Sequence, residues 1–574
     1  MQYDNFLINT YLGCLDPKNF HSFRKLELDE KARDIIERYR TINARYPASE
    51  LEKSGSVPPE LFDDLKAIGF FGLNIPARYG GVGLKVWQYL KVVEDIVAEN
   101  MSLGFTALAH LSIGVKGIVL FGTEAQKKQY LPQAAAGDMI FSYALTEPKT
   151  GSDARNIDTI ATLSDDGQSY VLNGQKTYIT NANYAGGLTV FAQMDPAKPG
   201  TMGAFIIETD WEGVRIGKDM PKMGLKASST AAVQLKNVNV PRENLLGQPG
   251  DGFKIAMTIL NYGRLALGAG SAGMIKQSLK DMTRRSALRT QFGISINQFE
   301  LVQEKMVKAR VNGTVAAAMT AFAAGALDRD PLAAVAIESS HCKLFGTTRA
   351  WDTLYDALQV AGGAGYLSTQ PYEKRMRDFR VTTIFEGTTE IHSIYPALFV
   401  IRAISKKMLA QHRDRISQVL FLIKGLLGTT ASNLRFAHPD MNKAMRFVRS
   451  SARRIRFLVH AGMLLHGKKI VQREFFLRRI STLSIYMFGI LAVLARLEAD
   501  RKAGRRIDET LEVLGYFLEE ARGERRINFR LFTSRKEKYH HRIIEDLFGT
   551  YAAAAAAGQG TRPQEEPVYA TDDR

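Results

Sequence analysis

The clearest candidate for chemistry is Glu386, in the run Ile-Phe-Glu-Gly-Thr at residues 384–388. Desolvation raises the pKa of a carboxylate in an apolar pocket, so Glu386 could act as a general base near neutral pH. Gly387 has no side chain and lets another backbone or a ligand approach closely. The spacing Thr383-x-x-Glu386 also fits a helix capping box, so a purely structural interpretation stays open on this segment alone.

A second polar stretch, Thr-Glu-Pro-Lys-Thr-Gly-Ser-Asp at residues 146–153, lies about 240 residues earlier in the chain. It combines hydroxyl groups with a glycine, which suits contact with a bound molecule. Together the two stretches indicate a base that removes a proton next to a carbonyl group, assisted by a cofactor.

Other chemical motifs are weak or absent. Residues 268–273 match the dinucleotide-binding pattern G-x-G-x-x-G, but that motif needs a preceding strand. No strand pattern precedes it, and residues 264–279 look like one helix of small residues, so we favour close helix packing. There is no Walker loop, His-Glu-x-x-His zinc motif or serine-hydrolase elbow. Cys14 and Cys342 lie far apart, so we expect neither a disulfide framework nor a metal site.

The 574 residues, of which 45% are hydrophobic, are enough for a large core and three or four domains. The N-terminus lacks the basic region and apolar run of a secretory signal, and the apolar residues 484–497 are too few to cross a bilayer. The low cysteine count fits a reducing compartment. We therefore expect a soluble or peripheral protein, either cytoplasmic or, after processing in a eukaryote, in the mitochondrial matrix.

Hydrophobic spacing divides the chain into segments of different structure. Residues 22–139 show the three- and four-residue spacing of helices. Residues 140–247 contain short β-rich runs, and Asn173-Gly174 between two of them predicts a hairpin in an antiparallel domain. Helical spacing returns over residues 248–400. We expect an α+β, mostly helical fold with a helical domain, a β domain and a helical bundle.

The remaining C-terminal part differs in charge. Residues 401–551 are predicted to form an extra helical domain. Residues 552–574, an alanine run followed by a polar tail, are predicted to be disordered. About +15 of the net charge of +17 falls after residue 400, so this domain should face something acidic. Membrane lipid, nucleic acid and simple solubility are all open explanations, although no recognition motif supports nucleic-acid binding.

Six groups of residues, in a fixed order, resemble segments of the acyl-CoA dehydrogenases. The resemblance covers residues 25–400 and is carried by residues 143–148 with 151–153, 173–176 with 179–181, 289–293, 359–365, 376–378 and 384–388. Further segments, residues 109–123, 259–264 and 469–479, resemble the very-long-chain branch more closely. Short- and medium-chain members stop near residue 400, so the extra domain supports this branch independently.

The resemblance implies FAD as the cofactor and assigns residues to it. Residues of the β domain would meet the flavin ring and phosphates, and the guanidinium fork of Arg289 would hold the pyrophosphate. The loop after residue 358 would reach the FAD of a neighbouring subunit, which implies a homodimer. The implied FAD residues are Tyr143, Ala144, Leu145, Thr146, Gly151, Ser152, Tyr178, Ile179, Thr180, Arg289, Gln359, Val360, Ala361, Gly362, Gly363, Thr388, Thr389 and Glu390.

The same resemblance assigns the substrate contacts and the base. Ser152, Arg264 and Gly387 would contact a fatty acyl-CoA. Some members carry the base just before the arginine equivalent to Arg264, where this chain has Gly263, so Glu386 is the only good candidate. Tyr178 stands where an indole is common in the family.

The implied reaction is α,β-dehydrogenation of a long-chain fatty acyl-CoA to trans-2-enoyl-CoA, the first step of β-oxidation. Glu386 would take a proton from C2 while C3 delivers hydride to the flavin, which then passes electrons to an electron-transfer flavoprotein. Two alternatives stay open, an acyl-CoA oxidase and an assembly or scaffold protein on the same fold. The basic domain could also bind a membrane surface.

Overall fold

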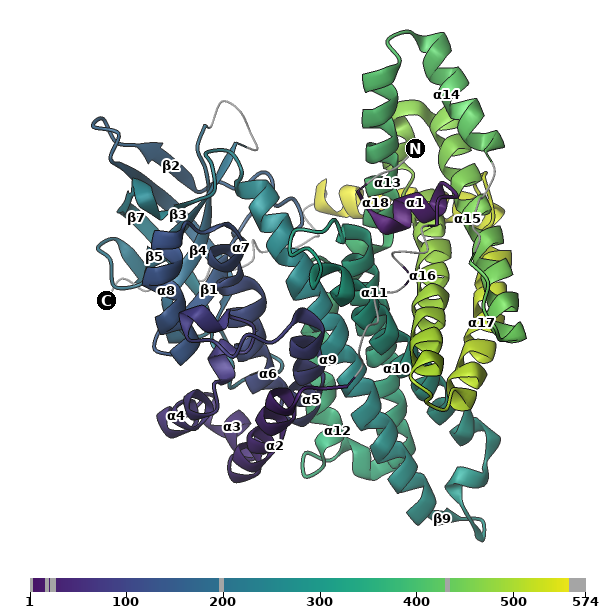
Figure 1. Cartoon of the computed structure of the whole chain (residues 1–574), viewed down its shortest axis with the longest axis horizontal. Coiled ribbons are helices and arrows are strands. Elements are labelled where there is room, and N and C mark those ends of the chain that lie inside the picture. The colour runs from purple at the N-terminus through teal and green to yellow at the C-terminus, as the bar shows by residue number, and fades with distance from the viewer. Residues whose placement is uncertain (1–3, 16–19, 21–26, 196–200, 429–433, 557–574) are drawn as a thin grey trace.

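The computed structural model describes residues 4–15, 20, 27–195, 201–428 and 434–556. Figure 1 shows a sheet on one side, long helices through the centre and further helices on the other side. Apolar side chains form one core inside the sheet domain and one continuous core through the helices. The expected order of helices, sheet and helices is confirmed.

The N-terminal part is helical. Its helices bury apolar residues at helical spacing, and α8 starts with a capping box in which Thr123 and Gln126 bond each other's backbone N–H groups. These helices are α1 (Phe6–Tyr11), α2 (Glu30–Arg45), α3 (Ala48–Ser54), α4 (Pro59–Ala67), α5 (Val86–Glu99), α6 (Met101–Leu108), α7 (Lys116–Phe121) and α8 (Glu124–Ala136). A π-helical turn, Ala109–Gly114, joins α6 to α7. It packs on the first strand so closely that a Cβ at Gly114 would stand 2.2 Å from the carbonyl oxygen of Phe141.

The β domain is a sheet of eight strands in the order β6-β7-β3-β2-β4-β5-β8, with β1 beside β4. Most pairs are antiparallel as expected, but β1 runs parallel to β4, so the sheet is mixed. The strands are β1 (Ile140–Ala144), β2 (Ile160–Leu163), β3 (Ser169–Thr180), β4 (Ala185–Gln193), β5 (Met202–Glu208), β6 (Val214–Ile216), β7 (Thr230–Pro241) and β8 (Leu245–Leu246).

The predicted hairpin at Asn173-Gly174 is wrong. Both residues lie inside the single strand β3, at an irregularity in its pairing with β7. Gly174 has a φ of 155°, and a Cβ there would stand 2.4 Å from the hydroxyl oxygen of Thr159. The glycine is therefore required by close approach of a neighbouring chain segment within a bulge, and not by a turn.

The central bundle consists of α9 (Gly252–Leu288), α10 (Glu300–Leu327), α11 (Ala336–Ala361), α12 (Pro371–Phe379) and α13 (Thr389–Gln411), with the small hairpin β9 (Thr290–Gln291) and β10 (Ile294–Ser295) after α9. Residues 268–273 lie within α9, which confirms helix packing over a dinucleotide loop. A Cβ at Gly273 would stand 1.9 Å from the carbonyl oxygen of Glu94, so the small residues let α9 press against α5.

The C-terminal helices are α14 (Arg415–Leu427), α15 (Pro439–His466), α16 (Glu474–Lys502), α17 (Asp508–Asn528) and α18 (Arg535–Ala556). The expected domain boundary at residue 400 falls inside α13, which continues unbroken into this part. Part of the expected disordered tail is helical, because α18 continues to Ala556 and alanine is the best helix former. Residues 557–574 lie outside the described residues.

Two stretches, Met101–Phe121 and Glu474–Lys502, are long and apolar enough to cross a membrane by length and composition. Most of each is buried inside the protein, 83% and 89% of the respective windows. Both therefore serve as core helices in this fold. The prediction from residues 484–497 considered only part of α16.

Candidate active site

Glu386 lies in a short loop between the end of α12 and the start of α13. A 3-10 turn, Arg380–Thr383, precedes the loop, and Thr388 caps α13 by accepting a hydrogen bond from the N–H of Ile391 at 3.3 Å. Glu386 itself has a φ of 55°, outside any helix. The capping-box interpretation of Thr383 and Glu386 is therefore wrong, and the Glu386 carboxylate does not cap a helix.

The Glu386 carboxylate is shielded from solvent and lies near two cations. Its Oε2 atom has no hydrogen-bond partner among the described residues. Burial raises its pKa to about 7, while the positive charges of Arg264 and Lys343 oppose that rise. A carboxylate with this pKa can accept a proton at neutral pH.

Gly263 on α9 faces this carboxylate directly. A Cβ at position 263 would stand 2.5 Å from both oxygens of Glu386. The two positions from which a base could act thus converge on one point in space, although 123 residues separate them in the chain. Because Gly263 has no side chain, the Glu386 carboxylate can occupy that point.

The backbone around the base is held by three side chains. The carbonyl oxygen of Glu386 accepts from His392 Nε2 at 3.0 Å and from Arg264 Nε at 3.4 Å. The carbonyl oxygen of Gly387 accepts from Lys343 Nζ at 2.6 Å. Sequence analysis missed Lys343 and His392. The one signal was a polar residue within an otherwise apolar helix face, which is too common to single them out.

The predicted flavin residues of β1 and β3 lie side by side. Ser142, on β1, donates to the carbonyl oxygen of Thr180 at 2.8 Å, and the N–H of Thr177 donates to the carbonyl oxygen of Thr146 at 2.9 Å. Tyr178 points outward, with 52% of its surface exposed and a φ of 56°. These strand ends offer an exposed aromatic ring next to backbone and hydroxyl groups, which suits a flat ligand carrying polar atoms.

Three predicted residues of this set, Ala144, Leu145 and Ile179, are buried, whereas Tyr143 is partly buried. Leu145 and Ile179 point into apolar cores, so only their backbone groups can meet a ligand. The hydroxyl of Tyr143 donates to the carbonyl oxygen of Ala256 at 3.3 Å. On the other side, Gly151 and Ser152 are exposed, and a Cβ at Gly151 would meet nothing within 4 Å.

A buried ion pair fixes the loop at residues 146–153. Lys176 Nζ lies 2.7 Å from Glu147 Oε1 and also donates to the carbonyl oxygen of Phe191 at 2.6 Å. The same carboxylate accepts from the N–H and the hydroxyl of Thr159 at 3.0 and 2.5 Å. Every charge in this cluster is hydrogen-bonded, so the loop has one defined position beside the strand ends.

Arg289 and the loop at Gln359–Gly363 lie far from Glu386 in the same chain. Arg289 follows Gly263 by 26 residues along α9, about 39 Å at 1.5 Å per residue. Residues 268 and 271 of α9 pack near residues 342 and 346 of α11, so both helices run in the same direction and end together. Arg289, Gly362 and Gly363 are exposed there. One chain therefore does not gather all the predicted FAD residues.

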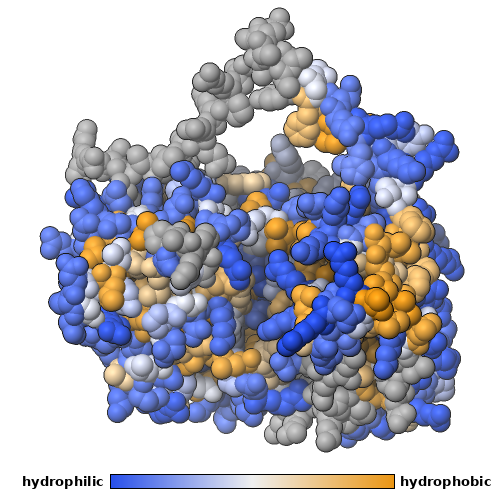
Figure 2. Space-filling model, turned by 90° about the horizontal axis from the view of Figure 1, so that it is seen from above, coloured by the Kyte–Doolittle hydropathy of each residue, from blue (hydrophilic) through white to orange (hydrophobic). Residues whose placement is uncertain are grey.

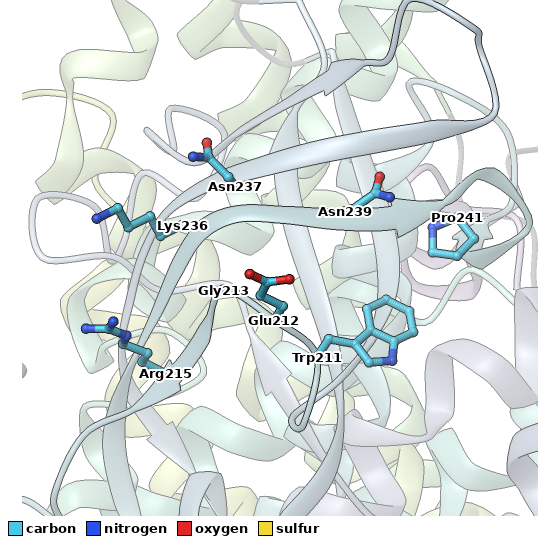
Figure 3. Close-up of a pocket in the computed structure, with 8 residues that line it drawn as sticks. All are labelled: Trp211, Glu212, Gly213, Arg215, Lys236, Asn237, Asn239 and Pro241. Atoms are coloured by element: carbon cyan, nitrogen blue, oxygen red, sulfur yellow. The ribbon is translucent and has the colours of Figure 1, made fainter.

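The last three predicted FAD residues begin α13. Thr388 is its N-cap, the hydroxyl of Thr389 donates to the carbonyl oxygen of Thr383 at 3.3 Å, and Glu390 is exposed. A shallow hollow elsewhere, between β6 and β7 (Figure 3), is lined by Trp211, Glu212, Gly213, Arg215, Lys236, Asn237, Asn239 and Pro241. It lies at the outer edge of the sheet and contains none of the predicted site residues.

Known domain families match nearly all of this core. Residues 27–138, 142–238 and 250–395 match the N-terminal, middle and C-terminal domains of acyl-CoA dehydrogenases, respectively. The human mitochondrial very-long-chain specific acyl-CoA dehydrogenase is 35% identical over 459 residues, 77% of this chain and 70% of that protein. The chain belongs to the acyl-CoA dehydrogenase family.

Other relatives of this acyl-CoA dehydrogenase include the C-terminal helices. The probable acyl-CoA dehydrogenase FadE10 of Mycobacterium tuberculosis is 31% identical over 529 residues, 87% of this chain and 81% of that protein. An acyl-CoA dehydrogenase of Bacillus anthracis, solved with FAD, covers 94% of both chains with a TM-score of 0.79 and 27% identity. Butyryl-CoA dehydrogenase of Megasphaera elsdenii aligns over all of its length but only 66% of this chain, at a TM-score of 0.62 and 32% identity. The extra helices are therefore an addition to a shared core.

The cofactor of this acyl-CoA dehydrogenase is FAD, which fits the residues present. The exposed ring of Tyr178 and the hydroxyls of Thr146 and Ser152 lie at the strand ends, and the unpartnered carboxylate oxygen of Glu386 marks the substrate side. The guanidinium of Arg264 also has a buried nitrogen, Nη1, which has no hydrogen-bond partner among the residues that the structure describes. No group of three or more potential metal ligands occurs in the described part of the chain.

Proposed function

We propose that this enzyme converts long-chain fatty acyl-CoA thioesters to trans-2-enoyl-CoA, with Glu386 as the base. The observation that carries the proposal is the buried, unpartnered Oε2 of Glu386, whose pKa is raised to about 7, opposite the bare backbone of Gly263. An unpartnered, desolvated carboxylate oxygen is ready to accept a proton from C2 of the substrate.

The protein groups around Glu386 fit this step. As Glu386 takes a proton from C2, negative charge develops on the thioester oxygen, and Arg264 and Lys343 supply positive charge nearby. Among the described residues the N–H of Glu386 has no hydrogen-bond acceptor, so it can donate to that oxygen. When bound, FAD accepts the hydride that leaves C3, and a C2=C3 double bond results.

Two measurements test this proposal. The variant Glu386→Gln keeps size and polarity but not basicity, so it should retain FAD and bind acyl-CoA while losing flavin bleaching by about three orders of magnitude or more. Near-normal bleaching would overturn the base assignment. An anaerobic titration of the native enzyme with acyl-CoAs of increasing length tests the substrate class.

The segment Met101–Phe121 supports a preference for long acyl chains. It packs beside the loop that carries Glu386, since the ring centroids of Phe105 and Phe385 lie 5.5 Å apart. This segment contains no carboxylate that could close the end of an acyl pocket. Each buried methylene contributes about 0.8 kcal/mol, so catalytic efficiency should rise through roughly C12 to C18. A maximum at C4 to C8 would contradict the long-chain proposal and leave the family assignment intact.

The electron acceptor separates the main proposal from the oxidase alternative. We propose an electron-transfer flavoprotein as the acceptor, and release of hydrogen peroxide in stoichiometric amounts would favour an oxidase instead. A scaffold role on the same fold would require no turnover. The retained base and strand-end residues favour an enzyme over that role.

We also propose that the FAD site is completed by a second subunit. Glu386 faces Gly263, and Arg289 lies about 39 Å further along α9 at 1.5 Å per residue, so the exposed Arg289 and the open loop at Gly362 would serve a FAD that another chain presents. This arrangement supports an obligate homodimer, in which each bundle end faces the partner's flavin site.

A membrane surface is the proposed site of action, because α14 carries an exposed apolar stripe. Ile416, Val419, Leu420, Ile423 and Leu427 follow helical spacing and are exposed, whereas Phe421 and Leu422 pack inward. Figure 2 looks down on the end where α14 lies and shows an apolar patch at its right edge. Exposed basic residues flank the stripe, namely Arg413, Arg415 and Lys424.

This combination fits an anionic lipid surface, where an apolar face enters the interface and basic residues meet the headgroups. The basic segments of α15 are different. Met445, Val448, Ile455 and Leu458 there are buried, so α15 packs its apolar side on the protein. Of its basic residues, Lys443, Arg446 and Arg453 are exposed, whereas Arg456 is buried.

A further inference from the structure

Ser340 on α11 and His392 on α13 form a buried pair beside the base loop. Ser340 Oγ lies 2.7 Å from His392 Nδ1, and neither residue has exposed surface. The other ring nitrogen, Nε2, lies 3.0 Å from the carbonyl oxygen of Glu386. The proton transfer described above does not use either residue, so their burial and alignment need another explanation.

The direction of each hydrogen bond follows from the acceptor at its end. A carbonyl oxygen can only accept, so Nε2 of His392 carries the proton. Burial lowers the pKa of His392 well below its usual value, and the positive charges of Arg264 and Lys343 lower it further. The imidazole is therefore neutral, its Nδ1 accepts, and the hydroxyl of Ser340 donates.

The backbone held by this pair is strained. Glu386 and Gly387 have φ values of 55° and 100°, so two consecutive residues occupy the left-handed half of conformational space. For a residue with a side chain this conformation is strained and persists only where the surroundings impose it. The imidazole packs directly on the loop, since a Cβ at Gly387 would stand 2.6 Å from His392 Nε2.

We propose that Ser340 and His392 are positioning residues for dehydrogenation. The hydroxyl of Ser340 fixes the orientation and tautomer of the His392 ring, and Nε2–H of that ring holds the carbonyl of Glu386. This bond sets the rotation of the Glu386 peptide and thereby aims the carboxylate at C2. The inference rests on the proposed role of Glu386 as the base.

The other contacts of the loop do not replace this bond. Arg264 Nε reaches the same carbonyl only at 3.4 Å, and Lys343 holds the next carbonyl, that of Gly387. A neutral imidazole also has an electrostatic advantage over a third cation. It donates a hydrogen bond without adding a positive charge that would lower the pKa of Glu386.

The test compares matched variants of the FAD-loaded enzyme by anaerobic stopped-flow bleaching with a saturating long-chain acyl-CoA. His392→Leu removes both hydrogen bonds and keeps an apolar side chain, while His392→Gln keeps a donor near the Nε2 position. Ser340→Ala removes the hydroxyl, and Ser271→Ala is the control, since Ser271 is equally buried but bonds only the carbonyl oxygen of Leu267 in its own helix.

We expect His392→Leu to lower the limiting bleaching rate by about 10- to 100-fold with less than a threefold change in acyl-CoA binding, since a misplaced catalytic group costs rate more than affinity. His392→Gln should recover most of the rate, Ser340→Ala should lose about three- to tenfold, and Ser271→Ala should match the native enzyme. Solvent reaching a loosened carboxylate should also move the pH midpoint of bleaching downward in His392→Leu.

A folded, FAD-loaded His392→Leu enzyme that bleaches at the native rate overturns the inference. Equal losses in His392→Leu and His392→Gln also overturn it, because ring packing and not the hydrogen bond would then be responsible. Glu386→Gln is run in parallel. Loss of bleaching there together with a native rate in His392→Leu refutes only the positioning role, whereas normal bleaching in Glu386→Gln refutes the base and, with it, this inference.

Discussion

Gly263 and Glu386 meet at one point from two different elements. A Cβ at Gly263 would stand 2.5 Å from both oxygens of the Glu386 carboxylate, closer than unbonded carbon and oxygen atoms approach. Helix α9 thus has no side chain at Gly263, where the loop before α13 places the side chain of Glu386. The presence of Glu386 and the absence of a side chain at 263 form a single structural feature.

Replacing Gly263 should disturb the base without removing it. Gly263→Ala forces the carboxylate to shift, so we expect at least a tenfold lower rate of flavin bleaching, since displacement of about 1 Å can cost 10²-fold. The control is Gly515→Ala in α17, where a Cβ would meet nothing within 4 Å. Equal rates in both variants would show that the close approach does not constrain the base.

The rate of dehydrogenation should depend on pH through Glu386. A base works when deprotonated, and burial raises the pKa of Glu386 to about 7. The bleaching rate should therefore be full well above pH 7 and be lost as the pH falls through about 7. Lys343→Met removes a positive charge that favours the carboxylate, so the midpoint should move upward. Lys308→Met, at a half-exposed lysine of α10, should leave the midpoint unchanged. A midpoint near 4.5 in the native enzyme would contradict the buried base.

Breaking the Glu147–Lys176 pair should destabilise the β domain. Lys176→Met leaves a buried carboxylate without its cation, which typically costs 3–5 kcal/mol. We expect a lower thermal midpoint and reduced FAD retention, measured by flavin fluorescence during heating. The double variant with Glu147→Leu should recover much of the loss. Lys236→Met on the exposed face of β7 serves as control, and equal stability of the two lysine variants would refute the prediction.

Mixed dimers should show which subunit Arg289 serves. We expect Glu386→Gln and Arg289→Glu to be inactive separately, the second through loss of FAD. If Arg289 completes the partner's site, a dimer carrying one of each chain has one site with both defects and one intact site. Co-expressed and tag-purified mixed dimers should then regain about half of the native activity per dimer. Absence of complementation would place Arg289 at its own chain's site.

The stripe on α14 should govern membrane binding. Leu420→Glu places a carboxylate in the middle of the exposed stripe, so sedimentation with vesicles of anionic phospholipid should fall several-fold. Binding of the native enzyme should also weaken when salt is raised well above physiological strength, because the basic contribution is screened. Leu163→Glu, at an exposed leucine of β2, is the matched control. Equal binding to neutral and anionic vesicles would show that the positive charge of the C-terminal helices does not direct membrane binding and serves solubility instead.

The sequence by itself indicated the candidate base and determined the order of the parts. Glu386 between an aromatic residue and glycine, and the succession of helical, β-rich and helical spacing, are local features, so they can be read from neighbouring residues. The small residues of α9 were also read correctly as helix packing, because no strand pattern precedes them.

Only the tertiary structure decided which groups act together. Asn173-Gly174 has the local preference for a turn, yet the approach of Thr159 turns it into a bulge within β3, since pairing partners lie elsewhere in the chain. Lys343 and His392 looked like any polar residue on a helix, and they matter because folding brings them to the carbonyls of Gly387 and Glu386. Desolvation, which raises the pKa of Glu386, likewise depends on atoms from several distant segments and therefore exists only in the folded protein.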